Sequence, residues 1–289
     1  MTVAAAQEPV SLSPALTASG EVRARAAGEN FSVASLLVGR RAAADLLAVY
    51  DYARLVDELG DAAAGDRLAL LDEAEAELDR AFAGRASAPV FRALEPLIER
   101  CSLPRDPFVR LIDANRRDQA SPEVQTYAEL LDYCSLSANP VGELVLHVFG
   151  AATPARIALS DSICTGLQLV EHWQDVAEDA RNGRIYLPAD DRGRFGVAAA
   201  DLLAGHASEP LRRLLELETD RAETLLRAGV PLVSSLRGRA RLAVAGYVGG
   251  GLANVAALRR ARFDVLAGAP KAGRLLRGRH TLLSLTGAA

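Results

Sequence analysis

The chain has 289 residues, half of them apolar, which is enough to bury a sizeable hydrophobic core. Its 33 Lys and Arg against 37 Asp and Glu give a net charge of −4, a balance that argues against a nucleic-acid partner. Cys101, Cys134 and Cys164 lack metal-ligand spacing, so we expect reduced thiols and a cytoplasmic protein.

The beginning of the chain differs in composition from the rest. Residues 1–25 are rich in Ala, Ser and Pro and lack the basic start and continuous apolar core of a signal peptide. We therefore expect them to form a disordered tail. No Gly- or Ser-rich linker and no internal repeat divides the remainder, so residues 26–289 are expected to form a single domain.

Apolar residues recur every three or four positions along most of the chain, which predicts helices. The predicted helices start at a cap near Asn30 or Ser32 and then cover residues 42–59, 66–82, 108–117, 126–150, 154–180, 202–227, 231–236 and 239–266. Prolines divide residues 89–107 into helices of about ten residues. Asn139-Pro140-Val141-Gly142 predicts a kink within residues 126–150. Alternating β-type patterns are scarce, so the predicted fold class is all-α.

Residues 242–258 come closest to a membrane span, because no charge lies between Arg241 and Arg259. The stretch contains four glycines, Tyr247 and Asn254, and it is shorter than a typical span. We favour a buried core helix here. Peripheral contact with a bilayer is the alternative.

Two acidic ladders are the main candidates for chemistry. If residues 168–180 are helical, Glu171, Asp175 and Asp179 stack on one face at a spacing of four residues. Asp57 and Asp61 repeat this spacing far upstream. Like charges at this spacing destabilise a helix, so a cation held between them would explain the pattern. Facing each other across a cavity between long helices, the two ladders would form a metal clamp.

Such a clamp suits a diphosphate. Mg²⁺ prefers oxygen ligands and binds through one or two carboxylates together with water and substrate phosphates. In a dry apolar cavity, neutralising the diphosphate lets a carbon–oxygen bond ionise and shields the resulting carbocation from water. For a single acidic pair the alternative is a solvated helix face, although apolar residues such as Leu169 and Trp173 surround the second ladder.

Other site types find less support in the sequence. A dinuclear iron bundle needs Glu-x-x-His pairs, and none of the four histidines has Glu three residues earlier. We find no Ser-His-Asp order, phosphate-binding glycine loop or dinucleotide fingerprint.

At these residues the chain resembles the squalene and phytoene synthase family, the head-to-head prenyl-diphosphate synthases. The resemblance covers residues 30–266 and is carried by Tyr50-x-x-x-Arg54-x-x-Asp57-x-x-x-Asp61 and by Gln168 through Asp175-x-x-x-Asp179 to Arg184-Ile185-Tyr186-Leu187-Pro188. Two further motifs are most similar to the bacterial hydroxysqualene synthase branch, often called HpnC, of hopanoid biosynthesis. They are Asn30-Phe31-x-Val33-Ala34-Ser35 and Tyr133-Cys134-x-x-Ser137-Ala138-Asn139-Pro140-Val141-Gly142. The resemblance implies an isoprenoid-synthase-type helical bundle around a central cavity, in one trans-isoprenyl-diphosphate-synthase-like domain.

The resemblance also implies roles for individual residues. The metal ligands for Mg²⁺ would be Asp57, Asp61, Asp175 and Asp179. The catalytic set would be Tyr50, Arg54, Tyr133 and Gln168, with Arg54 on the diphosphate or ordering the acids. The substrate-binding set would be Asn30, Arg40, Arg41, Glu171, Gln174, Arg184, Tyr186 and Tyr247. Core packing is the alternative for the tyrosines, and plain solvation is the alternative for Arg40 and Arg41.

The chain departs from the family pattern at two acidic positions. Glu58 stands where relatives often carry Asp, and Glu171 stands where they commonly carry Asn, which adds a negative charge to the second ladder. Trp173-Gln174-Asp175, by contrast, fits the hydroxysqualene branch.

The function implied by the resemblance is the Mg²⁺-dependent conversion of presqualene diphosphate into hydroxysqualene with release of diphosphate. The same-family alternative is a presqualene diphosphate, squalene or phytoene synthase that joins two prenyl diphosphates. An inactive prenyl-lipid-binding homologue is the alternative of another class, kept open by Glu171. We further expect functional coupling to other squalene-pathway enzymes and peripheral membrane contact as candidate partnerships.

Overall fold

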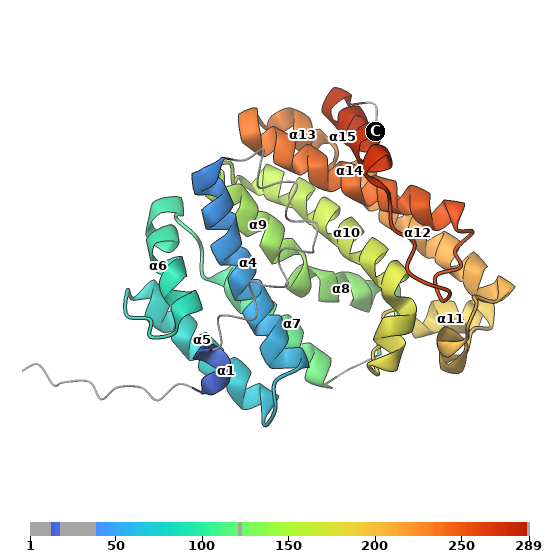
Figure 1. Cartoon of the computed structure of the whole chain (residues 1–289), viewed down its shortest axis with the longest axis horizontal. Helices are drawn as coiled ribbons and strands as arrows, with labels where there is room; N and C mark the ends of the chain where they lie inside the picture. Colours follow the sequence, from blue (N-terminus) through green and yellow to red (C-terminus); the bar gives the residue numbers. More distant parts are fainter. Residues whose placement is uncertain (1–12, 18–38, 121–122, 288–289) are drawn as a thin grey trace, which may run out of the picture.

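The computed structural model describes residues 13–17, 39–120 and 123–287, and these residues form helices and connecting loops without a β-strand (Figure 1). Glu123 and Ile185 form an isolated parallel bridge. The helices are α1 (Pro14–Thr17), α4 (Arg40–Asp61), α5 (Arg67–Phe82), α6 (Pro89–Cys101), α7 (Asp106–Ala120), α8 (Tyr127–Ser137), α9 (Asn139–Val148), α10 (Pro154–Arg181), α11 (Ala189–Phe195), the 3-10 helix η1 (Ala199–Leu203), α12 (Glu209–Gly229), α13 (Pro231–Ser235), α14 (Gly238–Arg260) and α15 (Arg274–Thr286). The all-α prediction is confirmed.

Side-chain caps fix the starts of several of these helices. Asp66 accepts a hydrogen bond from the Ala69 amide at the start of α5. Thr153 caps α10, where Pro154 takes the first helical position and has no amide hydrogen to satisfy. The caps agree with the predicted boundaries near residues 66 and 154.

The first large cluster of buried apolar side chains joins α4, α5, α6 and α7. Tyr52 lies at its centre, with its ring edge-to-face against Phe91 and Phe108 at centroid distances of 5.6 and 5.0 Å. The Tyr52 hydroxyl donates to the Phe108 carbonyl oxygen at 2.9 Å, so the buried polar end is satisfied. Leu16 of α1 also belongs to this cluster, inside the segment predicted to be a tail.

The second large cluster joins α8, α10, α12 and α14 and contains the fully buried Trp173. Ala114 of α7 belongs to this second cluster, whereas Leu144 of α9 belongs to the first. The helices α7 and α9 therefore connect two apolar cores, and Figure 1 shows them between α4 and α10.

Several helix boundaries differ from the prediction, and the helix predicted from residue 202 begins at Glu209 as α12. Residues 126–150 form two helices, because the first ends at Ser137 and Asn139-Pro140 opens the second. Pro96, expected to divide helices, lies inside α6. The last long helix stops at Arg260, where Arg262 and Phe263 adopt left-handed φ angles of 51° and 57°.

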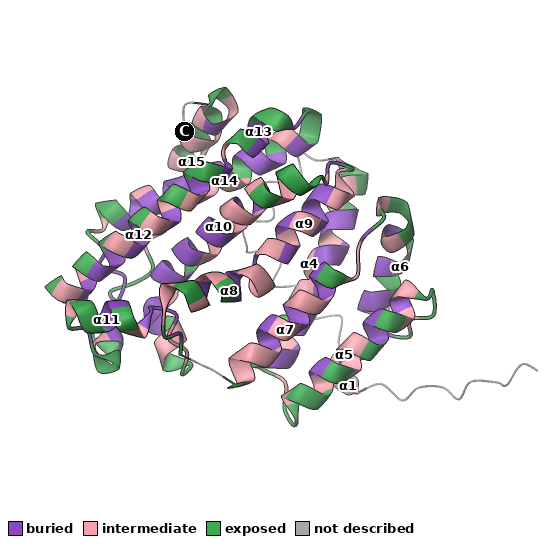
Figure 2. Ribbon diagram, turned by 180° about the vertical axis from the view of Figure 1, so that it is seen from behind, coloured by how far each residue is buried: buried purple, intermediate pink, exposed green. Residues whose placement is uncertain are grey.

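The apolar stretch 242–258 lies within α14. Among the residues that the structure describes, α14 is the one helix long and apolar enough to cross a membrane, but 61% of its most apolar window is buried inside the protein. Figure 2 shows buried positions recurring along it. The arrangement is that of a core helix, as the sequence favoured.

Candidate active site

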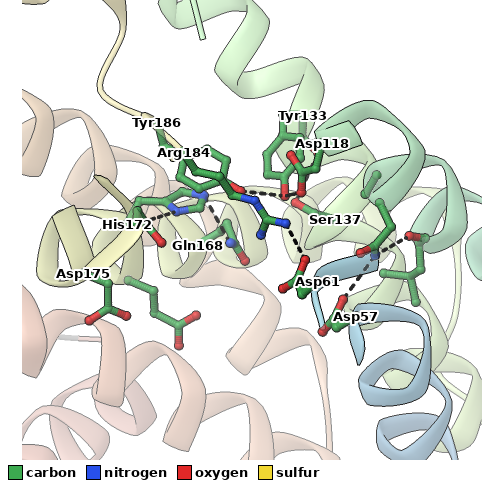
Figure 3. A pocket seen from close by; sticks show the side chains of 15 residues that line it. Asp57, Asp61, Asp118, Tyr133, Ser137, Gln168, His172, Asp175, Arg184 and Tyr186 are labelled. Atoms are coloured by element: carbon green, nitrogen blue, oxygen red, sulfur yellow. Dashed lines mark hydrogen bonds and ion pairs between the residues drawn. The ribbon is translucent and has the colours of Figure 1, made fainter. Parts of the chain in front are cut away.

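A cavity of about 250 Å³ lies where α4, α7, α8 and α10 face one another. It is lined by Asp57, Asp61, Leu111, Ala114, Asn115, Asp118, Tyr133, Ser137, Gln168, Glu171, His172, Asp175, Asp179, Arg184 and Tyr186. Figure 3 shows Asp57 and Asp61 reaching the cavity from α4, and Asp175 reaching it from α10. The structure thus brings the two ladders to one cavity.

The first ladder occupies the last turns of α4. Asn115 of α7 donates from Nδ2 to Asp57 Oδ1 at 3.2 Å and holds that carboxyl in place. The Asp57 side chain is exposed toward the open cavity, while its place in the last turns of α4 beside Asn115 removes part of its hydration. This desolvation raises the pKa of Asp57 to about 6, and the nearby charge of Asp61 adds to the shift.

The second ladder lies along one face of α10. Asp175 and Asp179 are half-buried, whereas Glu171 is exposed to the cavity. Burial raises the pKa of Asp175, and repulsion from Asp179 and Glu178 raises it further. Both ladders therefore carry carboxylates whose negative charge is disfavoured as they stand, and a cation would relieve this cost.

Arg184 links the two sides of the cavity. It lies just after α10, beyond the helix stop at Asn182 and Gly183, and its Nη2 donates to Asp61 Oδ1 of α4. Partial burial opposes its charge, but the pair with Asp61 outweighs this and raises the pKa of Arg184. A guanidinium in this position could also bind phosphate oxygens.

A polar and aromatic group forms another wall. Tyr133 donates from its hydroxyl to Asp118 Oδ2 at 2.8 Å, and the Tyr186 hydroxyl lies 3.3 Å from that of Tyr133. The Tyr186 ring stacks on His172 at a centroid distance of 3.8 Å, and His172 Nε2 lies 3.2 Å from Gln168 Nε2. Burial raises the pKa of Asp118 despite its hydrogen bond from Tyr133. Asp118, Tyr133 and Tyr186 also line a second hollow of about 590 Å³.

Several of the predicted site residues do not line the cavity. Gln174 is buried, and its amide donates to the Pro270 carbonyl oxygen. Tyr50 and Arg54 are half-buried on α4, Tyr247 packs in a small apolar cluster with Leu46 and Val145, and Arg40 and Arg41 are exposed at the start of α4. Asn30 lies outside the described residues.

The sequence reasoning missed Asn115, Asp118 and His172. Asn115 and Asp118 are three residues apart on α7, a spacing that places them on one helix face and could have identified them. The predicted helix ended at Arg117, one residue short of Asp118. His172 is four residues from Gln168 and therefore lies on the same helix face, and this spacing is the signal that points to it.

The donor chemistry of the cavity fits Mg²⁺ together with a phosphate-bearing substrate. Within the described ranges, no three His, Cys, Asp or Glu side chains are close enough to hold a metal ion by themselves. Mg²⁺ commonly takes one or two carboxylates and completes its shell with water and phosphate oxygens, and each ladder offers such a pair. Arg54 has a buried Nε without a hydrogen-bond partner among the described residues, and it lies close enough to lower the pKa of Asp57. A buried, unpaired donor of this kind favours an anionic ligand.

The comparisons with known proteins agree with this geometry. The family model for squalene/phytoene synthase matches residues 24–280. The chain is 34% identical over 213 residues to a hydroxysqualene synthase of Sinorhizobium fredii, covering 72% of each chain. It is 36% identical over 201 residues to a phytoene synthase of Arthrospira platensis, covering 63% of this chain and 65% of the relative.

A solved structure extends the likeness to three dimensions. The crystal structure of the squalene synthase HpnC from Alicyclobacillus acidocaldarius superposes with a TM-score of 0.79 and 45% sequence identity, covering 86% of this chain and 95% of that one. This likeness supports the isoprenoid-synthase type of helical fold. With the family match over most of its length and two acidic ladders at one cavity, the chain is an enzyme of the squalene/phytoene synthase family.

Proposed function

We propose that the enzyme converts presqualene diphosphate and water into hydroxysqualene, diphosphate and a proton, with Mg²⁺ as cofactor. The observation that carries the proposal is the meeting of Asp57 and Asp61 with Asp175 and Asp179 at one cavity. The hydroxysqualene synthase among the relatives supports the choice of product.

The first step of the proposed reaction is departure of the diphosphate. The two ladders would hold Mg²⁺, which when bound neutralises the leaving group as its carbon–oxygen bond ionises. Arg184 at the cavity would bind phosphate oxygens that the carboxylates alone would repel, and Arg54, which lies beside Asp57 outside the cavity lining, would order that carboxylate. Glu171 adds an acid to this end of the cavity and therefore increases the need for cations.

The second step is rearrangement of the cyclopropylcarbinyl cation and its capture by water. The stacked rings of Tyr186 and His172 lie at the cavity wall, and an aromatic face stabilises a nearby cation. The Tyr133–Asp118 pair lies beside them and offers a hydroxyl and a carboxylate that can hold one water molecule. On capture, the oxygen lone pair forms the new carbon–oxygen bond and the water loses a proton to Asp118 Oδ1 or Oδ2.

The proposal is tested by supplying purified protein with Mg²⁺ and either presqualene diphosphate or farnesyl diphosphate, in the absence of reductant. Products are identified by mass spectrometry. We expect hydroxysqualene from presqualene diphosphate and no product from farnesyl diphosphate. Omission of Mg²⁺ with a chelator should abolish the product.

The second candidate function is the joining of two prenyl diphosphates, favoured by the similarity to a phytoene synthase. In the same assay, presqualene diphosphate accumulating from farnesyl diphosphate would replace the first proposal with this one. Absence of product from farnesyl, presqualene and geranylgeranyl diphosphates would favour the inactive prenyl-lipid-binding homologue.

A further inference from the structure

The last described helix, α15, packs along α14 through one face only. Arg241 of α14 donates from Nη2 to the Leu285 carbonyl oxygen at 2.8 Å, and a Cβ added at Gly249 would overlap the backbone of Thr281. Ser284 is buried and Leu285 packs against the large core cluster. These contacts fix which face of α15 points into the protein.

The outer face of α15 carries two large apolar side chains where solvent should favour polar residues. Leu275 is 93% exposed and Leu282 is 66% exposed, the two most exposed large hydrophobic side chains among the described residues. They are seven residues apart, which is two helical turns, so both lie on the same side of the helix. Figure 2 shows α15 at the edge of the molecule with exposed turns.

The charged side chains at this end of the chain are all positive. Residues 265–289 contain Lys271, Arg274, Arg277 and Arg279 and no Asp or Glu, although the whole chain carries a net charge of −4. Arg274 and Arg279 are exposed and lie next to Leu275 and within one turn of Leu282 respectively, and neither forms a salt bridge within the described part of the chain. The outer face thus combines exposed leucines with unpaired positive charge.

We propose that the outer face of α15, defined by Leu275 and Leu282 with Arg274 and Arg279, docks on an anionic lipid bilayer. The leucines enter the boundary between head groups and acyl chains, and the guanidinium groups contact lipid phosphates. A helix of 13 residues is too short to span a bilayer, so it lies in the plane of the interface. From the sequence, bilayer contact was an alternative for residues 242–258 of α14, which are largely buried; the proposed contact lies on α15 instead.

Charge complementarity favours a lipid surface over a second copy of this chain. A symmetric contact through the same face would bring Arg274 and Arg279 of both copies close together, and like charges in a shrinking water layer repel. An anionic bilayer offers a negative charge to each of these side chains and an apolar phase to each leucine.

The test is flotation of the full-length protein with vesicles made of phosphatidylcholine alone or of phosphatidylcholine with phosphatidylglycerol. We expect binding to the anionic vesicles, weakened by added salt, and little binding to the neutral ones. The double variant Leu275→Ser/Leu282→Ser should lower the partition coefficient at least about tenfold, because two apolar side chains no longer leave water. Arg274→Gln/Arg279→Gln should lower it about tenfold at low salt and remove most of the salt dependence.

Matched controls come from the opposite end of the molecule. Leu68→Ser removes a leucine that is 49% exposed on α5, and Arg85→Gln/Arg92→Gln removes two exposed charges near α6. Both should bind vesicles as the wild type does. Thermal melts and sedimentation confirm folding and mass. The proposal is overturned if the wild type does not bind anionic vesicles or if the α15 variants bind them as the wild type does. It is also overturned if sedimentation shows that the wild type is a dimer and that the α15 variants are monomers. None of these readouts depends on catalytic activity.

Discussion

At the residue scale, the acids of the two ladders should each be required for turnover. Asp57→Asn and Asp175→Asn keep the size of the side chain but remove a charge from opposite sides of the cavity. We expect each to lower kcat at least about a hundredfold, because charge stabilisation of the leaving group acts mainly in the transition state. The measurement is steady-state kinetics with presqualene diphosphate.

Asp132→Asn is the matched control for these variants. Asp132 is an exposed acid on α8 that does not line the cavity, so its removal should leave kcat unchanged. Wild-type turnover in both Asp57→Asn and Asp175→Asn would refute the assignment of the ladders to the leaving group.

Asp118 should control the fate of the cation and not its formation. Its carboxylate accepts from Tyr133 and is separate from both ladders. In Asp118→Asn the proton acceptor is lost. We therefore expect the yield of the alcohol to fall about tenfold relative to that of elimination products, whereas the rate of diphosphate release should change less. Mass spectrometry of the product mixture and a phosphate assay measure the two separately. Tyr133→Phe should shift the product ratio in the same direction, and equal losses of alcohol and diphosphate would indicate a merely structural role.

The ladders could be predicted from sequence because both partners of each pair lie on one helix, where a spacing of four fixes their relation. The contacts that complete the cavity join different helices, as Asn115 of α7 does with Asp57 of α4. Spacing along the chain carries no information on such pairs. Gln174 shows the same limit, since its position beside Asp175 suggests the site while its amide faces the segment at Pro270.

At the scale of elements, the close contact between α10 and α12 depends on a missing side chain. A Cβ at Gly229 would lie 2.8 Å from the Leu159 carbonyl oxygen, and backbone cannot rotate away. We therefore expect Gly229→Ala to reduce the free energy of unfolding by about 2 kcal/mol, measured by urea denaturation. Gly246→Ala on α14 meets nothing within 4 Å and should instead stabilise the helix by about 0.5 kcal/mol. Equal effects of the two substitutions would contradict this packing argument.

The junction of α11 and α12 should give stability a pH dependence. Glu218 of α12 is fully buried, and although Arg221 donates to its Oε1 at 2.7 Å, burial raises the pKa of Glu218 to about 8. Because this pKa exceeds the ordinary value of 4.5, the unfolded chain loses the proton first as pH rises. The stabilisation by neutral Glu218 is complete below about pH 4.5 and is lost progressively up to about pH 8.

Glu218→Gln tests this, because Gln stays neutral at every pH. Relative to the wild type, the variant should gain a few kcal/mol of unfolding free energy between pH 5 and pH 8, as a shift of one pKa unit is worth about 1.4 kcal/mol. Urea denaturation at both pH values gives the difference. Parallel pH profiles for the two proteins would show that Glu218 does not titrate in this range.

The long helices were predictable because their apolar period and caps agree, as at Asp66 and Thr153. The boundary at residue 260 was not, because the turn that ends this helix places Arg262 and Phe263 in the left-handed region, where Gly or Asn is the usual residue. The sequence of α15 has no such regular signal, because Gly278 and two threonines interrupt it and exposed leucines blur its apolar face. Packing on α14 decides that this segment is a helix.

At the scale of the whole molecule, the cavity lies where the two apolar cores meet. Asp57 and Asp61 lie on α4, which packs in the first core with α5, α6 and α7. Asp175 and Asp179 lie on α10, which packs in the second core with α12 and α14. A ligand that contacts both ladders would therefore tie the two halves together, as the Arg184–Asp61 pair already does.

This bridging predicts a joint effect of Mg²⁺ and inorganic diphosphate on thermal stability. At concentrations about a hundredfold above Kd, both ligands together should raise Tm by roughly 5 °C, because binding to the native state alone stabilises it. Either ligand alone should raise Tm much less, since each ladder repels diphosphate without the metal and holds the metal weakly without diphosphate. Calorimetry of the wild type measures the three conditions. If the ligand spans both ladders, Asp57→Asn and Asp175→Asn should each remove most of the joint shift, whereas Asp132→Asn should retain it. A shift that survives Asp57→Asn but not Asp175→Asn would place the ligand on α10 alone and refute the bridge.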